Sequence, residues 1–391
     1  MTVGEGFASF AVKVFFMLDL EAIRSEFPVT RSWVYLNHAG IAPVSRRVRR
    51  AMQGLLKDVE ENGMVNHAAW MEMVQRTRVA SARMLNALPS EIAFVKNTTE
   101  GILIVANGIR WRRGDNVVIA EREFPANVYP WLNLKPKGVE VRFAREVEGC
   151  IPIEEVARLI DARTRVVSLS SVEFSTGYRN DLDALGTLCH DRGVLFCVDA
   201  IQSLGALPID GRRSRIDFLS ADGHKGLLGP EGAGVFDCAR SALRKIDVAG
   251  LGWGGVVNPT DFLNYDATPA PTAERFESGT LNTAGIYGLR AALELLQPVG
   301  IAEIETRILA LTDRLCAGLR ERGYRVHSPR GPSEKSGIVV FSHDRHGADD
   351  LLRRFKEHRI IGALRDGKVR LSPHFYNTEA EIDRVIEVLP G

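Results

Sequence analysis

The sequence predicts an α/β protein built on a mainly parallel sheet in a large domain, with a small α+β domain at the C-terminal side. Between about residues 90 and 240, short runs rich in β-branched residues alternate with amphipathic stretches. This alternation is typical of a mainly parallel sheet with helices on both faces. Beyond residue 296 the pattern changes to one long helix, short strands and a final helix.

The individual elements follow from the same patterns. Buried strands are expected at residues 92–95, 116–120, 139–143, 166–169, 194–198 and 218–220, and helices at 153–162 and 182–191. In the C-terminal part we expect helices over 302–322 and 379–389, and strands at 324–326, 338–341 and 369–371. A chain of 391 residues is too long to form one small core. We therefore assign residues 36–296 to the large domain and residues 1–35 with 297–391 to the small one.

Composition limits the classes of partner. Fifty basic and 49 acidic residues nearly cancel, and no block of one sign occurs, which argues against nucleic acid and anionic membrane surfaces. The five cysteines are scattered without a CxxC pair, so we expect no disulfide, no metal site and a cytoplasmic location. The apolar stretch 7–17 is short and contains Lys13, unlike a signal peptide or a membrane span. We interpret residues 1–16 as an upstream start before Met17.

The first of three chemically informative segments is Asn97-Thr98-Thr99-Glu100-Gly101, which follows a strand and opens a helix. Asn97 and Glu100 have the spacing of a capping box. Free N–H groups and hydroxyls at such a helix start suit a phosphate. An ordinary helix cap is the alternative explanation for this segment alone.

Two further segments place charged residues at strand ends. Asp199 ends an apolar strand, where a carboxylate is costly to bury unless a cation pairs with it. Lys225 lies in Asp222-Gly223-His224-Lys225-Gly226, where a flat ligand can approach closely and a carbonyl can react with the amine. Taken singly, Asp199 is equally consistent with a helix cap, and Lys225 with a surface lysine. Together with the phosphate site they match the needs of pyridoxal 5′-phosphate (PLP).

With these residues identified, the chain resembles the class V aminotransferase family of fold-type I PLP-dependent enzymes, which includes cysteine desulfurases, kynureninases and isopenicillin N epimerase-like proteins. The resemblance runs from about Leu18 to the C-terminus, and it implies a mainly parallel, seven-stranded type of sheet in the large domain. It is carried by YLNHAG (35–40), FVKNTTEGI (94–102), EFPANVYPW (123–131), VDAIQSLG (198–205), DGHKG (222–226), RFESGTLNT (275–283) and RLSPHFYNT (370–378).

The resemblance implies a role for each matching residue. Lys225 forms the Schiff base with PLP and moves the Cα proton, and Asp199 pairs with the pyridinium nitrogen. Gln202 lies near the phenolic oxygen of the ring and Phe124 stacks on the ring. The phosphate is held by Thr98, Thr99, His224 and, from the other subunit of a homodimer, Thr280. Arg370 binds the substrate carboxylate, and Asn37, His38 and Ala39 lie at the substrate entrance.

The pattern departs from some relatives at named positions. Phe124 stands where cysteine desulfurases have a histidine, and the loop Ile361–Lys368 contains no cysteine. We therefore predict that this enzyme is not a cysteine desulfurase. Asp222 replaces a small hydroxyl residue and is expected to turn away from the phosphate or to pair with a base. Glu173-Phe174 replaces polar residues without an evident reason.

The leading hypothesis is a PLP-dependent aminotransferase acting on an amino acid or related amine. Epimerisation and β-elimination by a lyase of the same family are the alternatives, because the sequence does not fix the fate of the shared carbanion. A non-catalytic PLP-fold protein is a further alternative, disfavoured by the joint presence of Lys225, Asp199 and Arg370.

Overall fold

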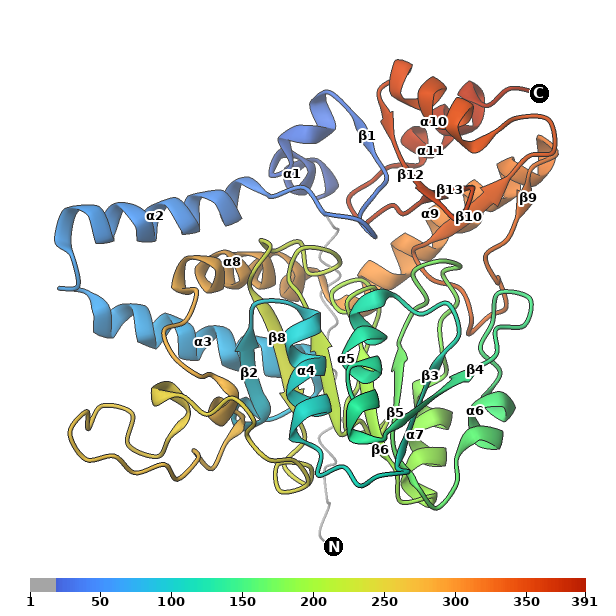
Figure 1. Cartoon of the computed structure of the whole chain (residues 1–391). Coiled ribbons are helices and arrows are strands. Elements are labelled where there is room, and N and C mark those ends of the chain that lie inside the picture. Colours follow the sequence, from blue (N-terminus) through green and yellow to red (C-terminus); the bar gives the residue numbers. More distant parts are fainter. Residues whose placement is uncertain (1–18) are drawn as a thin grey trace, which may run out of the picture.

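The computed structural model describes residues 19–391, so the interpretations of residues 1–16 and 7–17 lie outside the described residues. A twisted sheet lies at the centre of the molecule with helices against both of its faces (Figure 1). Its seven strands are in the order β2-β8-β7-β6-β5-β3-β4. They are β2 (Ile92–Val95), β3 (Asn116–Ala120), β4 (Glu140–Ala144), β5 (Thr164–Ser170), β6 (Leu195–Asp199), β7 (Phe218–Ala221) and β8 (Gly234–Cys238).

Six of these strands were expected, and their bounds differ from the prediction by at most two residues. The additional strand is β8, which pairs antiparallel with both β2 and β7. The remaining pairs in the sheet are parallel. The mainly parallel α/β sheet is therefore confirmed, with one antiparallel strand inserted near its edge.

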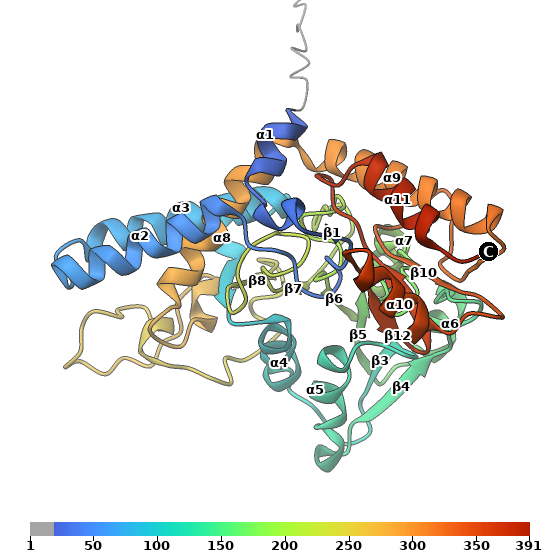
Figure 2. The same cartoon turned by 90° about the horizontal axis from the view of Figure 1, so that it is seen from above.

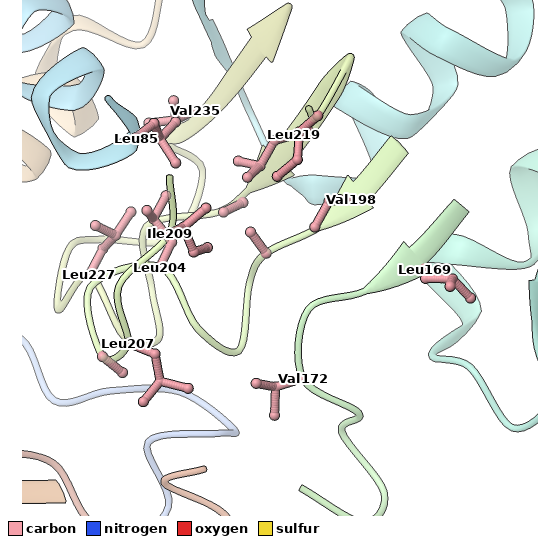
Figure 3. Packing of buried hydrophobic residues seen from close by; sticks show 14 of the residues in the cluster. Leu85, Leu169, Val172, Val198, Leu204, Leu207, Ile209, Leu219, Leu227 and Val235 are labelled. Carbon is pink, nitrogen blue, oxygen red and sulfur yellow. The ribbon is translucent and has the colours of Figure 1, made fainter. Parts of the chain in front are cut away.

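Alternate residues of the strands supply two separate cores. Val117 and Ile119 of β3 pack with Trp131 on one face, whereas Val118 packs on the other. Helices α4 (Thr98–Gly108) and α5 (Tyr129–Leu132) contribute to the first face. The second core contains Val198, Leu219 and Val235 from the strands together with residues of α6 (Ile153–Leu159), α7 (Leu182–Asp191) and α8 (Thr283–Val299) (Figure 3). Burial of both faces explains why the strands are apolar at successive positions.

Two long helices, α2 (Arg46–Asn62) and α3 (His67–Leu85), form a hairpin that runs beside α8 (Figures 1 and 2). The N-terminal part also contains α1 (Leu20–Ser25) and β1 (Val34–Tyr35). Short 3₁₀ helices lie between the longer elements, at Pro28–Arg31, Pro89–Glu91, Pro125–Asn127, Lys135–Lys137, Trp253–Gly255 and Ala273–Phe276.

The C-terminal residues form a smaller α+β unit. Its antiparallel sheet has the order β12-β13-β10-β9. The strands are β9 (Arg325–Val326), β10 (Val339–Ser342), β12 (Ala363–Arg365) and β13 (Lys368–Leu371), with helices α9 (Ile301–Glu321), α10 (Ala348–Glu357) and α11 (Glu379–Val388). Strand β11 (Ile360–Ile361) pairs in parallel with β1, and Val34 packs in the same core as Phe355. The domain boundaries themselves stay a prediction.

Candidate active site

A cavity of about 570 Å³ lies at the carboxyl edge of the central sheet, where Asp199 ends β6 and Lys225 follows β7. Ligands of open α/β sheets bind at this edge. The N-terminal segment and the small α+β unit close the cavity from the other side. The predicted site residues that line it are Asn37, Ala39, Thr98, Thr99, Phe124, Asp199, Gln202, His224, Lys225 and Arg370.

The loop that carries Lys225 packs backbone against backbone. A Cβ atom at Gly223 would lie 2.6 Å from the carbonyl oxygen of Ala233, and one at Gly226 would lie 2.6 Å from that of Leu204. The sequence interpretation was that these glycines admit a flat ligand. That interpretation stays a prediction, and the structure adds that these glycines allow the loop to pack tightly on its own scaffold, which fixes where the lysine emerges.

The side chain of Lys225 is buried and faces the cavity. Its Nζ lies 5.5 Å from the centroid of the Phe124 ring. Burial lowers the pKa of Lys225 to about 8, and the positive charges of Arg370 and Arg365 act in the same direction, while Asp199 opposes them. An amine that loses its proton near neutral pH can attack a carbonyl group.

Asp199 has one carboxylate oxygen with a partner and one without. Oδ1 accepts a hydrogen bond from the Ile201 backbone N–H at 3.0 Å. Oδ2 is buried and has no hydrogen-bond partner among residues 19–391. Burial and the nearby charge of Glu123 together raise the pKa of Asp199 to about 7. An unpaired buried polar atom costs about 1–3 kcal/mol, and a protonated ring nitrogen in the cavity would remove that cost. This observation fits PLP.

The phosphate site predicted at α4 is held together by a network of hydrogen bonds. Asn97 Oδ1 accepts from the Glu100 N–H at 2.9 Å, as predicted for the cap. The reciprocal bond is shifted, because Glu100 accepts from the N–H of Lys96 at 2.6 Å and not from that of Asn97. Thr98 Oγ1 accepts from the Asp222 N–H at 3.1 Å, which joins α4 to the lysine loop.

The acid next to this phosphate site pairs with a base. Asp222 Oδ2 lies 2.8 Å from His224 Nδ1, and Asp222 Oδ1 accepts from the Gly223 N–H at 2.7 Å. The carboxylate is thus turned toward partners within its own loop. Of the two expectations for Asp222, pairing with a base is the one observed.

Arg370 lies on β13 and is almost completely buried, with 1% of its surface exposed. Its Nη1 donates to the backbone oxygen of Phe174 at 2.9 Å. Its Nε and Nη2 are buried without a hydrogen-bond partner in the part of the chain that the structure describes. Burial lowers the pKa of Arg370 to about 9. These two adjacent donors match the two oxygens of a carboxylate.

The structure supplies a reason for Phe174 that is not evident from the sequence. The Phe174 ring meets the Phe124 ring edge to face, with centroids 5.1 Å apart and an interplanar angle of 78°. Both rings line the cavity. Phe174 thus extends the apolar wall begun by Phe124, and its carbonyl group orients Arg370.

Two buried acids next to these aromatic residues in the sequence, Glu123 and Glu173, were not predicted as functional residues. Glu123 accepts hydrogen bonds from the N–H of Phe124 at 2.8 Å, from the N–H and hydroxyl of Ser170 at 2.9 and 2.7 Å, and from Asn127 at 3.1 Å. Glu173 accepts from Asn180 at 2.7 Å. Burial raises the pKa of both carboxyl groups, most strongly that of Glu173. The sequence feature that could have identified Glu123 is its position directly before Phe124 in the segment EFPAN.

Two predicted site residues do not line the cavity. His38 is buried, with Nδ1 2.9 Å from the backbone oxygen of Ser372 and Nε2 2.7 Å from the Tyr376 hydroxyl. Burial lowers its pKa to about 4. Its position is therefore that of a neutral residue joining the N-terminal segment to the small unit. Thr280 lines a separate cavity of about 240 Å³, and its role toward a second subunit stays a prediction.

Comparison with known proteins supports the same family. The family model described as Aminotransferase class-V matches residues 34–385. A probable cysteine desulfurase of Methanothermobacter thermautotrophicus is 33% identical, over 94% of this chain and 97% of the relative. An Escherichia coli cysteine desulfurase is 31% identical over 94% and 97% of the two chains. The uncharacterized aminotransferase YcbU of Bacillus subtilis is 26% identical over 94% and 96%.

Solved structures give the same result. The apo cysteine desulfurase of Thermococcus onnurineus superposes with a TM-score of 0.85 at 25% identity, covering 94% of this chain and 96% of that one. The complex of the cystine C–S lyase C-DES with its product cysteine persulfide has the same TM-score and identity, covering 92% and 98%. A mutant of C-DES is described with glycine linked to its PLP cofactor. The family, the fold type and the PLP cofactor predicted from the sequence are therefore confirmed, and this chain belongs to the class V aminotransferase family of fold-type I PLP-dependent enzymes.

Proposed function

We propose that this enzyme is a β-eliminating C–S lyase that acts on a sulfur-containing α-amino acid. The observation that carries the proposal is the composition of the cavity wall, which unites Lys225, Asp199 and Arg370 with two phenylalanines and contains no cysteine. The relatives support a C–S bond-cleaving reaction, because several are named cysteine desulfurases and one structural neighbour is a cystine C–S lyase. Transamination, the leading hypothesis from the sequence, becomes the second candidate.

Each residue of the site has a defined task in such a reaction. Arg370 binds the substrate carboxylate through Nε and Nη2, which fixes the Cα–H bond relative to Lys225. The neutral amine of Lys225 accepts the Cα proton. PLP, when bound, supplies the electron sink, and Asp199 supports it by holding a positive charge opposite Oδ2. The rings of Phe124 and Phe174 exclude water from the side where they lie.

The sulfur must leave without help from a thiolate of this chain. Four of the five cysteines are buried and Cys150 is half-buried. Burial raises the pKa of each, to about 11 for Cys150 and to about 12 for Cys189 and Cys197. At neutral pH they are protonated thiols. A substrate whose sulfur is already a good leaving group, such as a disulfide, fits this site best.

The segment predicted as a loop before Arg370 is a β-hairpin, so that expectation is corrected. Strands β12 and β13 pair from Ala363 with Arg370 to Arg365 with Lys368. The two turn residues, Asp366 and Gly367, have φ values of 48° and 70°, as a tight two-residue turn requires. A closed hairpin without a cysteine lacks the mobile thiolate of a persulfide-forming enzyme. The prediction that this chain is not a cysteine desulfurase stands as part of the proposal.

For L-cystine the balanced reaction is cystine plus water giving pyruvate, ammonia and cysteine persulfide. The Cα proton goes to Lys225, the Cβ–S bond breaks with its electron pair on sulfur, and the aminoacrylate is released and hydrolysed. The test is to incubate purified holoenzyme with L-cystine and to measure pyruvate, ammonia and persulfide. We expect equimolar pyruvate and ammonia. In Arg370→Lys, kcat/KM should fall by about 10–100-fold, because a bidentate ion pair is replaced by a single donor.

Other outcomes assign other reactions. Alanine and sulfide from cysteine, lost when one of the five cysteines is mutated, would establish a desulfurase and refute the proposal. Conversion of the cofactor to its pyridoxamine form would establish transamination. Loss of the Cα proton without pyruvate would establish epimerisation.

Two broader expectations belong to the same proposal. The enzyme works as a homodimer whose subunits share active sites, and it resides in the cytoplasm, where thiols stay reduced. Within residues 19–391, none of the helices has the length and apolar character needed to span a membrane.

A further inference from the structure

A second cavity, of about 770 Å³, lies at the amino edge of the central sheet. Arg165, Leu195 and Asp217, which line it, lie at the starts of β5 and β6 and just before β7. Lys225 and Asp199 follow the opposite ends of the same set of strands. This cavity is therefore separate from the active site, and the lyase reaction uses none of its residues. Its size falls in the range of small-molecule sites.

The base of this cavity contains a carboxyl group without a partner. Asp237 on β8 is 4% exposed, and its Oδ1 is buried with no hydrogen-bond partner among residues 19–391. Burial raises the pKa of Asp237 to about 8. Leaving a buried acceptor unsatisfied costs about 1–3 kcal/mol. A ligand that donates an N–H group to Asp237 would remove this cost.

The rim of the cavity is basic. Three acidic side chains line the cavity. The five basic ones are Arg165, Arg212, Arg215, Arg240 and Lys245. Lys245 is neutralised by Asp217 at 3.0 Å, and Arg165 by Asp115 at 3.1 Å. The closest acidic oxygen to Arg212 is 3.9 Å away, on Glu91. Arg215 pairs with Asp191 at 3.7 Å. The Arg240 guanidinium has no ion pair within the described part of the chain, so Arg240 and the loosely paired Arg212 are the rim groups most available for an anion.

Between the buried carboxyl group and the basic rim, the wall is apolar. Leu85, Val194 and Ile216 contribute to it. A flat ring fits such a wall, with its polar edge at Asp237 and its charged end at the rim. Nucleotides are a class of small molecules that joins an amino-substituted flat ring to a phosphate.

We propose that this cavity is a second ligand site, and that it binds a mononucleotide whose base carries an amino group. Asp237 accepts from that amino group, and Arg212 and Arg240 bind the phosphate. Leaving the buried oxygen of Asp237 unsatisfied costs about 1–3 kcal/mol, so the amino group that satisfies it contributes about ten-fold in affinity. The site is independent of the proposed lyase reaction.

The test is calorimetric titration of the holoenzyme with GMP, AMP, CMP and UMP, and with inorganic phosphate. UMP is the matched control, because its base has no amino group. We expect at least one of the other three nucleotides to bind about ten-fold tighter than UMP. Inorganic phosphate should bind weakest.

Two variants separate the two halves of the site. Asp237→Leu should bring the preferred nucleotide close to the affinity of UMP, because an apolar side chain of similar size accepts no hydrogen bond. Arg212→Gln should weaken all bound nucleotides by a similar factor, since it contacts only the shared phosphate. Arg212 is exposed, so this variant keeps the proposal testable if Asp237→Leu fails to fold. The cofactor absorption band and pyruvate formation should be unchanged in both variants.

The proposal is overturned by any of three results. The first is no binding of any nucleotide at about 5 mM, where a Kd of about 1 mM is still detectable. The second is inorganic phosphate binding as tightly as the nucleotides. The third is nucleotide binding that neither variant weakens.

Discussion

At the scale of single residues, Lys225 carries the most specific prediction. Borohydride reduction should fix PLP covalently on Lys225, because this buried amine, with its pKa lowered to about 8, faces the cavity. Lys225→Ala should purify without the absorption band of lysine-bound cofactor. Peptide mass spectrometry checks the assignment, and an adduct on another lysine would contradict it.

Asp199 gives a second prediction at this scale, on stability. Its folded pKa of about 7 lies above the unfolded value near 3.8. Between pH 3.8 and pH 7 the carboxyl group is therefore protonated in the folded state and ionised in the unfolded state. The contribution of Asp199 to the free energy of unfolding declines as the pH rises through this range. Above about pH 7 the contribution is constant and unfavourable. Without cofactor, Asp199→Asn should remove this penalty.

The measurement is thermal unfolding of the cofactor-free protein at pH 5 and pH 8. We expect Asp199→Asn to raise the Tm relative to wild type by about 2–4 °C more at pH 8 than at pH 5. Asp261→Asn, at an exposed position, is the control and should show no such difference. With PLP bound, the advantage of the variant should disappear, since the carboxylate then has a cationic partner.

At the scale of elements, the segment after β3 depends on one buried carboxylate. Glu123 joins this segment to β5 through Ser170 and holds the backbone of Phe124. Glu123→Ala should destabilise the protein by about 2–4 kcal/mol, because it leaves several buried donors without a partner. Urea unfolding measures this, and Glu60→Ala on the exposed side of α2 is the control. A change within about 0.5 kcal/mol would show that Glu123 is not a structural centre.

At the scale of the whole molecule, we predict a homodimer in which Thr280 completes the phosphate site of the partner. The aromatic residues Trp253, Phe262 and Tyr265 are 55%, 67% and 92% exposed, which is unusual for a surface that stays in water. Sedimentation at micromolar concentration should show the dimer.

Subunit mixing tests whether the site is shared. Lys225→Ala and Thr280→Ala should each bind PLP poorly. A heterodimer of the two contains one site with both native residues, and random exchange in an equal mixture makes about half of the dimers heterodimers. Mixing should therefore restore lysine-bound cofactor to about a quarter of the wild-type content. If mixing restores nothing while dimers form, Thr280 acts within its own subunit, or not on the cofactor at all.

The sequence by itself determined the parallel sheet, its strand positions and the residues at the strand ends. These features are local: β-branched runs of four to seven residues define the strands, and Asp199 and Lys225 lie at the ends of two of them. The carboxyl ends of parallel strands meet at one edge, so convergence of these side chains followed from the topology. The motifs also sufficed to identify the family.

The tertiary structure decided what local pattern does not encode. Strand β8 follows a glycine-rich loop, and its place in the sheet depends on antiparallel pairing both with β7, the strand before it, and with β2, which is distant in sequence. His38 faces Ser372 and Tyr376 instead of the cavity, because the N-terminal segment pairs with a strand more than 300 residues away. The unpaired oxygens of Asp199 and Asp237 became visible only in the folded chain, because the burial of a polar atom depends on everything packed around it.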